Sequence, residues 1–240
     1  MNKYESIIII TSGWVDFKGR LKISSLFSAF QEIAYNHAVI LKFGYDDLSK
    51  LNLYWVLSKM KIVIDRMPVW NETCRFVTWP RKPDAVTAYR DFEVIDAKGK
   101  QIIRATSSWA IISSDNLKPQ RISVLGLELD FNEETVFNNP RIDKIPQSDR
   151  INYSYTRDIR YSDIDVNNHT NNTRYIEFIA DGLPDTVDRS ADITEVIIHF
   201  ISESRINDKI NISYNTSLPE RVLVDGVDGD NTVFRCLITF

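Results

Sequence analysis

The residues best suited to chemistry in this chain lie close together, between positions 160 and 172. They include the carboxylates of Asp163 and Asp165, the amide of Asn167 and the imidazole of His169. The segment runs directly into a helical pattern of apolar residues, and a helix N-terminus offers unpaired backbone N–H groups and a partial positive charge. Asp, Asn and His side chains placed there can orient a water molecule and hold an anion. We therefore take this segment as a candidate site for acid–base chemistry.

The same segment has a purely structural interpretation, which its spacing alone favours. Asp163, Asp165 and Asn167 are also of the residue types that form turns and cap helices. We expect Asp163 to brace the loop, and Asn171 and Asn172 to satisfy backbone groups in the first turn of the helix. A metal site is not expected, because no second ligand lies near the imidazole in the sequence.

The composition is that of an ordinary globular protein of 240 residues, with 43% hydrophobic and 26% charged residues. A net charge of −4 argues against a general nucleic-acid binder, which would be basic. Cys74 and Cys236 lie in apolar, strand-like runs, so no disulfide framework is expected and the cytoplasm is the expected location. No apolar run reaches the roughly eighteen residues of a membrane span, and no signal-peptide pattern is present. His37 and His199 are expected to be structural.

The periodicity of apolar residues predicts the same order of elements twice along the chain. The first half is predicted to contain a strand at 7–11, a helix at 21–43 with Ser24 as its N-cap and Gly44 as its stop, and strands at 54–65, 73–79, 86–95 and 101–113, the last two joined by a turn at 96–99. Residues 119–149 show weak periodicity and are predicted to be a linker. The second half is predicted to contain a strand at 151–161, a helix at 169–182, and strands at 194–202, 209–216, 221–227 and 232–240.

The two halves form an internal repeat of element order rather than of residue identity. We predict an α+β fold with domains at 1–118 and 150–240, in each of which a strongly curved antiparallel sheet wraps around one buried helix. Joining two such domains covers the sheet edge and the helix flank that one alone would expose. The counterpart of the polar segment in the first half is 16–22, which has no Asn or His. Catalytic groups are therefore expected only in the second half.

Several ordered motifs identify a related family. The most specific is Ser162-Asp163-Ile164-Asp165-Val166-Asn167, followed by His169, Asn171, Asn172 and Tyr175-Ile176. The first half contributes the segments 30–38, 55–60, 65–70, 89–92 and 104–109. With these motifs, nearly the whole chain resembles the acyl-acyl-carrier-protein (acyl-ACP) thioesterases, which implies a tandem, or double, hotdog fold.

The resemblance implies an enzyme that hydrolyses the thioester of fatty acyl-ACP and releases free fatty acid and the carrier protein. It places the catalytic set on four residues, of which the last lies on a later strand: Asp165, Asn167, His169 and Glu203. It also implies an acyl chain held between the helix and the sheet of the first half, where the candidate substrate-binding residues are Phe27, Phe30, Trp55 and Arg90. The resemblance implies neither a cofactor nor a metal.

The chain departs from the family pattern at two positions. Plant members carry a cysteine directly after the glutamate, where this chain has Ser204, so a mechanism with that cysteine as nucleophile does not apply here. Thr170 replaces the valine that usually follows the histidine, and little consequence is expected from this change.

Hydrolysis of an already activated thioester needs a positioned water, a base and hydrogen-bond donors for the oxyanion. Glu203 and His169 are the candidates for base and proton shuttle. Asn167, with backbone N–H groups at the start of the helix, is the candidate oxyanion donor, and Asp165 is expected to hold His169 in one tautomer. Direct attack by Asp165 on the thioester carbonyl is the rival mechanism, and the sequence leaves both open.

Three other functions fit parts of the pattern: an acyl-CoA thioesterase of the same fold, a non-catalytic acyl-binding hotdog protein, and a hotdog dehydratase. A dehydratase would leave Asp165 and Asn167 unexplained. Acyl carrier proteins are acidic, so a local basic patch is expected for docking. Its candidates are Arg81, Lys82, Arg90, Arg157, Arg160 and Arg174. No nucleic acid or membrane is expected as a partner, and the chain is expected to be a monomer or a homodimer.

Overall fold

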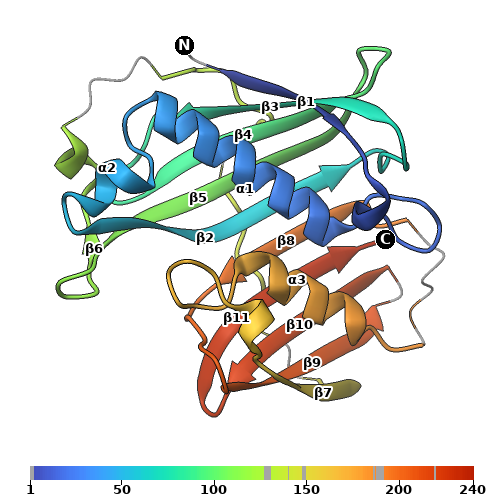
Figure 1. Cartoon of the computed structure of the whole chain (residues 1–240). Helices are drawn as coiled ribbons and strands as arrows, with labels where there is room; N and C mark the ends of the chain where they lie inside the picture. The colour runs from blue at the N-terminus through green and yellow to red at the C-terminus, as the bar shows by residue number, and fades with distance from the viewer. Residues whose placement is uncertain are drawn as a thin grey trace. The chain divides into compact units, whose positions relative to one another are not determined.

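The computed structural model describes residues 3–126, 131–139, 141–147, 150–185, 187, 192–218 and 220–240. The chain forms two compact units, Met1–Ile142 (unit 1) and Asp143–Phe240 (unit 2). Each consists mainly of an antiparallel sheet and one longer helix (Figure 1). Most of the segment predicted as a linker therefore belongs to unit 1, where β6 (Pro119–Gln120) pairs with β5 (Gln101–Ser113).

Unit 1 is built on five antiparallel strands in the order β1-β3-β4-β5-β2. Their bounds are β1 (Tyr4–Ile9), β2 (Leu53–Ile64), β3 (Thr73–Arg81) and β4 (Ala88–Ile95), together with β5. The helix α1 (Ile23–Ile40) runs across one face of this sheet (Figure 1). The predicted turn at 96–99 is confirmed, because the N–H of Gly99 donates to the carbonyl of Asp96 over 3.0 Å.

The helix α1 forms where apolar residues recur at helical spacing, and that face is the one it buries. The ring of Phe30 lies 4.7 Å from the ring of Phe92 on β4 and 6.1 Å from that of Phe76 on β3, measured between centroids. Burying a phenylalanine of this kind stabilises the fold by roughly 1.5–3 kcal/mol. The predicted cap is wrong: Lys22 occupies the N-cap position, and Ser24 lies within the first turn.

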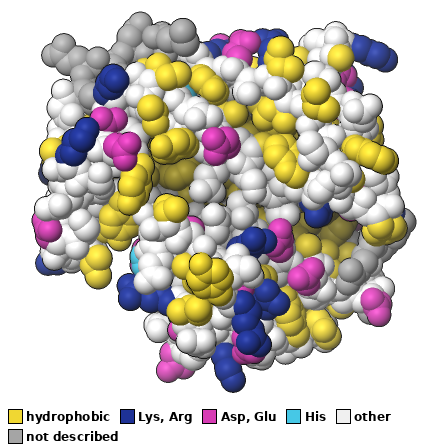
Figure 2. All heavy atoms as spheres, viewed as in Figure 1, with side chains coloured by type: hydrophobic (Ala, Val, Ile, Leu, Met, Phe, Trp, Pro, Cys, Tyr) yellow, Lys and Arg dark blue, Asp and Glu magenta, His cyan; other side chains and the backbone are white. Residues whose placement is uncertain are grey.

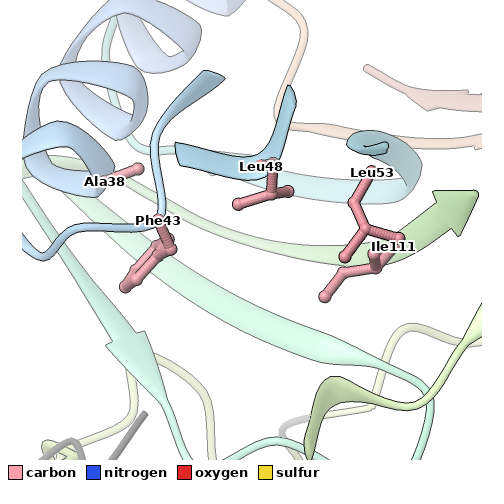
Figure 3. Close-up of a cluster of buried hydrophobic side chains, with 5 residues drawn as sticks. All are labelled: Ala38, Phe43, Leu48, Leu53 and Ile111. Carbon is pink, nitrogen blue, oxygen red and sulfur yellow. The ribbon is translucent and has the colours of Figure 1, made fainter. Parts of the chain in front are cut away.

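A short second helix, α2 (Tyr45–Ser49), was not predicted. Gly44 is the residue before α2 rather than the stop of α1, which ends at Ile40. The helix is held by Leu48, which joins a buried cluster with Ala38, Phe43, Leu53 and Ile111 (Figure 3). Five residues give too short a periodic pattern to reveal a helix. The packing of Leu48 holds it, together with a cap in which the N–H of Gly44 donates to Asp47 Oδ2 over 3.2 Å.

The strand β3 continues through Pro80 to Arg81, although it was predicted to end at Trp79. Proline lacks an N–H group and is usually confined to places where a strand has lost a neighbour. Here β1 pairs with β3 only as far as Thr78, so Pro80 lies beyond the last pair with β1.

Unit 2 repeats the arrangement with antiparallel strands in the order β8-β11-β10-β9-β7. Their bounds are β7 (Tyr153–Asp158), β8 (Glu195–Phe200), β9 (Lys209–Leu218), β10 (Arg221–Asp228) and β11 (Asn231–Thr239). The helix α3 (Asn172–Asp181) packs on this sheet, with the ring of Tyr175 5.3 Å from that of Phe234 on β11. It begins three residues later than predicted, which leaves His169 in the preceding loop. It ends at Asp181, with Gly182 at the C-cap position as predicted.

In the described part of the chain, no helix combines the length and the apolar character needed to cross a membrane.

Gly182 ends α3 at a point where no side chain fits. A Cβ atom there would overlap the ring of Tyr155 and the hydroxyl of Tyr214. We predict that Gly182→Ala lowers the free energy of unfolding by about 1–3 kcal/mol, the usual cost of overpacking, in a denaturant titration. Gly13→Ala is the matched control, since a Cβ at Gly13 meets nothing within 4 Å. Equal stability of the two variants would contradict this account of the helix end.

Candidate active site

The loop between β7 and α3 makes a tight turn that delivers His169. The N–H of Asp165 donates to the carbonyl of His169 over 2.8 Å, and the N–H of Asn168 donates to the carbonyl of Asp165 over 3.0 Å. Asn168 has a φ of 63°, in the left-handed region that asparagine tolerates better than most residues. The turn thus has a backbone reason for its residue types, independent of any chemistry.

The imidazole of His169 lies against the carboxylate of Glu203, with His169 Nε2 3.0 Å from Glu203 Oε2. The His169 side chain is 17% exposed and that of Glu203 is 42% exposed, so the pair lies at the surface of unit 2 with the carboxylate open to solvent. The two candidates for base and proton shuttle are therefore in contact. The resemblance implied that Glu203 lies on a strand, but the structure places it in the loop between β8 and β9.

Arg205 is a second charged neighbour of the imidazole, and no sequence pattern predicted it. Its Nη2 lies 3.4 Å from His169 Nε2. A ring nitrogen can donate a hydrogen bond or accept one, but not both at once. The contacts with Glu203 and Arg205 therefore belong to different protonation forms of the ring, and the shorter one is that with Glu203.

The carboxylate of Asp165 holds the turn together. Its Oδ1 accepts from the backbone N–H of Asn167 over 2.8 Å and from the backbone N–H of His169 over 3.3 Å. The structure thus differs from the expectation that Asp165 fixes the tautomer of the imidazole, because the carboxylate reaches the backbone of His169 rather than its ring. Asn167 is exposed on the turn. Because α3 begins at Asn172 rather than at 169, Asn167 lies farther from the backbone N–H groups of the helix start than was expected.

Two further polar residues of the segment have the structural roles that were expected. Asp163 is buried, and its Oδ2 accepts from the backbone N–H of Arg160 over 2.8 Å and lies 3.5 Å from Arg157 Nη2. Asn171 is the N-cap of α3, and its Oδ1 accepts from the N–H of Thr173 over 2.9 Å. Asp163 therefore braces the loop, and Asn171 starts the helix.

The loops that carry His169 and Glu203 are tied together directly beside these two residues. The N–H of Thr170, which follows His169, donates to the carbonyl of Ser204, which follows Glu203, over 2.8 Å. Residues far apart in the sequence are thereby brought into register. Sequence reasoning noted Thr170 and Ser204 only as departures from a family pattern and missed this role.

Unit 1 contains the same turn without the imidazole and the carboxylate of the pair. Asp16 Oδ1 accepts from the backbone N–H groups of Lys18 and Arg20, each over 2.9 Å, and the N–H of Leu21 donates to the carbonyl of Pro68 over 2.8 Å. This confirms segment 16–22 as the counterpart of the polar segment. Arg20 stands where unit 2 has His169, and Met67, before Pro68, stands where unit 2 has Glu203.

The candidate acyl-binding residues all lie in unit 1. Phe27 and Phe30 are buried on α1, and Trp55 on β2 is partly buried, with its Nε1 donating to the carbonyl of Phe43 over 3.0 Å. Arg90 is buried on β4, where Nη1 lies 3.2 Å from Nδ1 of His37 and 3.3 Å from Thr78 Oγ1. Burial lowers the pKa of Arg90 to about 9.

Two of the proposed docking cations are not available to a partner. Arg81 is buried and pairs with buried Asp91, with Arg81 Nε 3.0 Å from Asp91 Oδ1, and Arg90 is buried as described above. Three surface cations are each paired with a carboxylate: Arg157 with Asp163, Arg160 with Asp158, and Arg174 with Glu177.

Among the described residues, no group of three or more His, Cys, Asp or Glu side chains is arranged to hold a metal ion.

Comparison with known proteins matches both units to one family. Residues 1–124 match the model of the acyl-ACP thioesterase N-terminal domain, and residues 146–236 match that of the C-terminal domain. The chain belongs to the acyl-ACP thioesterase family. The resemblance based on the sequence motifs and the prediction of a thioester hydrolase are therefore confirmed.

Individual relatives agree with this assignment. An acyl-ACP thioesterase structure from Bacteroides thetaiotaomicron has a TM-score of 0.87 and 28% identity, and the match covers 99% of this chain and 97% of that one. The structure of a 12:0-ACP thioesterase from Umbellularia californica has a TM-score of 0.90 at 23% identity, over 99% of this chain and 96% of that one. These likenesses confirm the tandem hotdog fold.

Among curated proteins, oleoyl-acyl carrier protein thioesterase 2 of Arabidopsis thaliana, a chloroplastic protein, is 27% identical over 95% of this chain and 68% of its own length. An acyl-[acyl-carrier-protein] hydrolase of Cuphea viscosissima is 28% identical over 90% of this chain and 54% of its own length. The acyl-ACP thioesterase chain thus spans between about half and two thirds of these relatives.

Proposed function

We propose that the protein hydrolyses fatty acyl-ACP, releasing free fatty acid and acyl carrier protein, by water attack assisted by Glu203 and His169. The observation that carries this proposal is the contact of 3.0 Å between His169 Nε2 and Glu203 Oε2 in a site open to solvent. A carboxylate bound to an imidazole stabilises the imidazolium that forms when the ring takes a proton. Family membership and the names of the relatives support the thioester as the substrate class.

The proposed reaction moves one proton through this pair. As a water oxygen bonds to the thioester carbon, one of its protons passes to the Glu203–His169 pair. When the C–S bond breaks, the pair returns the proton to the departing thiolate of the carrier. The products are the fatty acid and the free thiol, so the pair ends in its starting state and no cofactor or metal is required.

We assign the oxyanion contact to Asn167. The tetrahedral intermediate places negative charge on the former carbonyl oxygen, which a preorganised N–H donor stabilises. The amide of Asn167 is exposed on the turn two residues before His169, which supports this assignment.

The acyl chain is proposed to contact four residues of unit 1: Phe27, Phe30, Trp55 and Arg90. The three aromatic side chains supply an apolar wall, on which each buried methylene contributes about 0.8 kcal/mol.

Docking of an acidic carrier protein is proposed to use cations on the same loops as the catalytic pair. Arg205 is exposed beside His169, and the Arg160 side chain is 68% exposed. Figure 2 shows Lys and Arg side chains gathered in the lower part of the view, where Figure 1 draws α3 and β7. This local positive charge supports an acidic partner despite the net negative charge of the chain.

The cytoplasm is the proposed compartment, and the two cysteines support it. Cys74 and Cys236 are both free and buried, as in a reducing environment. The expectation of a monomer or a homodimer stays a prediction.

The direct experiment offers the purified chain a panel of acyl-ACP substrates of increasing chain length, with matched acyl-CoA thioesters, and measures the fatty acid released. We expect hydrolysis with a preference for acyl-ACP, and a loss of roughly 10²–10⁴ in kcat for His169→Ala and for Glu203→Gln, the usual range for a lost acid–base group.

Glu177→Gln is the matched control for this experiment, because Glu177 is also a partly exposed carboxylate paired with a basic side chain. Faster turnover of acyl-CoA would replace the proposed carrier. Binding without release of fatty acid would favour a non-catalytic acyl-binding protein. Normal turnover by Glu203→Gln would refute the assigned mechanism.

The turn shared by the two units favours water over Asp165 as the nucleophile. Asp16 makes the same backbone contacts in unit 1, where Arg20 stands at the position of the imidazole. We predict that Asp165→Asn keeps kcat within about tenfold of the wild type, because an amide oxygen still accepts the two backbone N–H groups. Asp165→Ala, which removes the brace, should cost more. Loss of turnover to the level of His169→Ala in the Asn variant would instead support direct attack by Asp165.

A further inference from the structure

Three buried hydroxyl groups contact one another, and two of them belong to the residues that follow His169 and Glu203 in the chain. Ser204 is 0% exposed, Tyr175 2% and Thr170 4%. Ser204 Oγ lies 2.7 Å from Thr170 Oγ1 and 2.8 Å from the hydroxyl oxygen of Tyr175. Thr170 Oγ1 also donates to the carbonyl of Ser204 over 3.2 Å. Because Thr170 follows His169 and Ser204 follows Glu203, these contacts join the two loops at the residues next to the pair.

One arrangement of hydrogens satisfies all three hydroxyls. Tyr175 donates to Ser204 Oγ, Ser204 donates to Thr170 Oγ1, and Thr170 donates to the carbonyl of Ser204. Burial raises the pKa of Tyr175, which keeps its phenol protonated and therefore a donor. The Ser204 hydroxyl is thus fully used inside the fold and is not presented to a substrate, so it is not a nucleophile.

The internal repeat separates the role of these hydroxyls from that of the backbone. In unit 1 the equivalent loops are joined by two backbone hydrogen bonds, from the N–H of Leu21 to Pro68 and from the N–H of Trp70 to Gly19, each of 2.8 Å, the same length as the bond from Thr170 to Ser204. Neither Leu21 nor Pro68 has a hydroxyl group. Backbone hydrogen bonds therefore connect these loops in unit 1 without hydroxyl contacts between Leu21 and Pro68. The hydroxyl contacts are an addition found in the unit that carries the imidazole and the carboxylate.

We propose that Thr170, Ser204 and Tyr175 are positioning residues that fix the separation of the His169 imidazole and the Glu203 carboxylate. The proposal rests on the catalytic role assigned to that pair under the proposed function. A buried, fully satisfied hydroxyl network resists small displacements of the loops, which a single backbone bond allows more easily. Catalytic groups depend on such support, since a misplacement of about 1 Å can cost roughly 10²-fold in rate.

The test is a pair of substitutions at Thr170 that differ in the hydroxyl. Thr170→Val removes the hydroxyl and preserves the side-chain shape, whereas Thr170→Ser retains it. Contrary to the small effect expected from the sequence, we expect Thr170→Val to lower kcat by about tenfold to 100-fold with KM unchanged, and Thr170→Ser to restore most of the rate. Tyr175→Phe, which removes only the outer donor, should lower kcat in the same direction and serves if Thr170→Val does not fold.

A second measurement reads the geometry without relying on turnover. The ¹⁵N signals of the His169 imidazole, assigned with His169→Ala, are recorded by NMR at a fixed pH. In Thr170→Val they should move toward those of Glu203→Gln, because the carboxylate is no longer held against the ring. This arm still decides the proposal if the wild-type protein hydrolyses none of the thioesters, a result that would overturn the proposed function alone.

Ser58→Ala is the matched control for the loss of a hydroxyl. Ser58 Oγ in unit 1 donates to the carbonyl of Ser108 over 2.9 Å and lies 3.2 Å from Ser108 Oγ, a similar pair of contacts. Its removal should leave kcat and the His169 signals unchanged. The proposal is overturned if Thr170→Val matches the wild type in kcat and imidazole signals, or if Ser58→Ala loses as much kcat as Thr170→Val.

Discussion

The contact between the His169 imidazole and the Glu203 carboxylate depends on the way two loops are joined. The backbone hydrogen bond from Thr170 to Ser204 brings the segment before α3 against the segment after β8. Both loops are otherwise surface connections, which are usually the mobile parts of a fold. Once they are joined, the residues on either side of the bond face each other, and an acid–base pair can form without a buried charge.

The internal repeat shows one turn geometry that presents different side chains in the two units. Both units brace the turn with an aspartate, Asp16 or Asp165, and both join it to a second loop by a backbone bond. In unit 1 the corresponding positions hold Arg20 and Met67. In unit 2 the same frame presents His169 and Glu203. A frame that folds without this pair can tolerate its substitution, which makes the proposed catalytic roles separable from stability.

The sequence predicted much of the fold because its signals are local. Period-two and helical patterns place the strands and α1, and glycine marks the end of α3. The failures are those where tertiary packing decides: α2 exists because Leu48 enters a buried cluster, and β3 passes through Pro80 where β1 no longer pairs with it. The contact of Glu203 with His169 was expected only from the family resemblance, since no local pattern links the two loops. Arg205 had no sequence signal at all, and Ser204 was noted only as a departure from the family pattern.

The most direct test of the account is a double-mutant cycle in kcat for His169→Ala and Glu203→Gln on a single acyl-ACP substrate. Residues that act as one unit show strongly non-additive losses. The account predicts that the double variant is no slower than the slower single variant, because either change already disables the pair. Losses that multiply in the double variant would show that the two residues act independently, and would contradict the central claim.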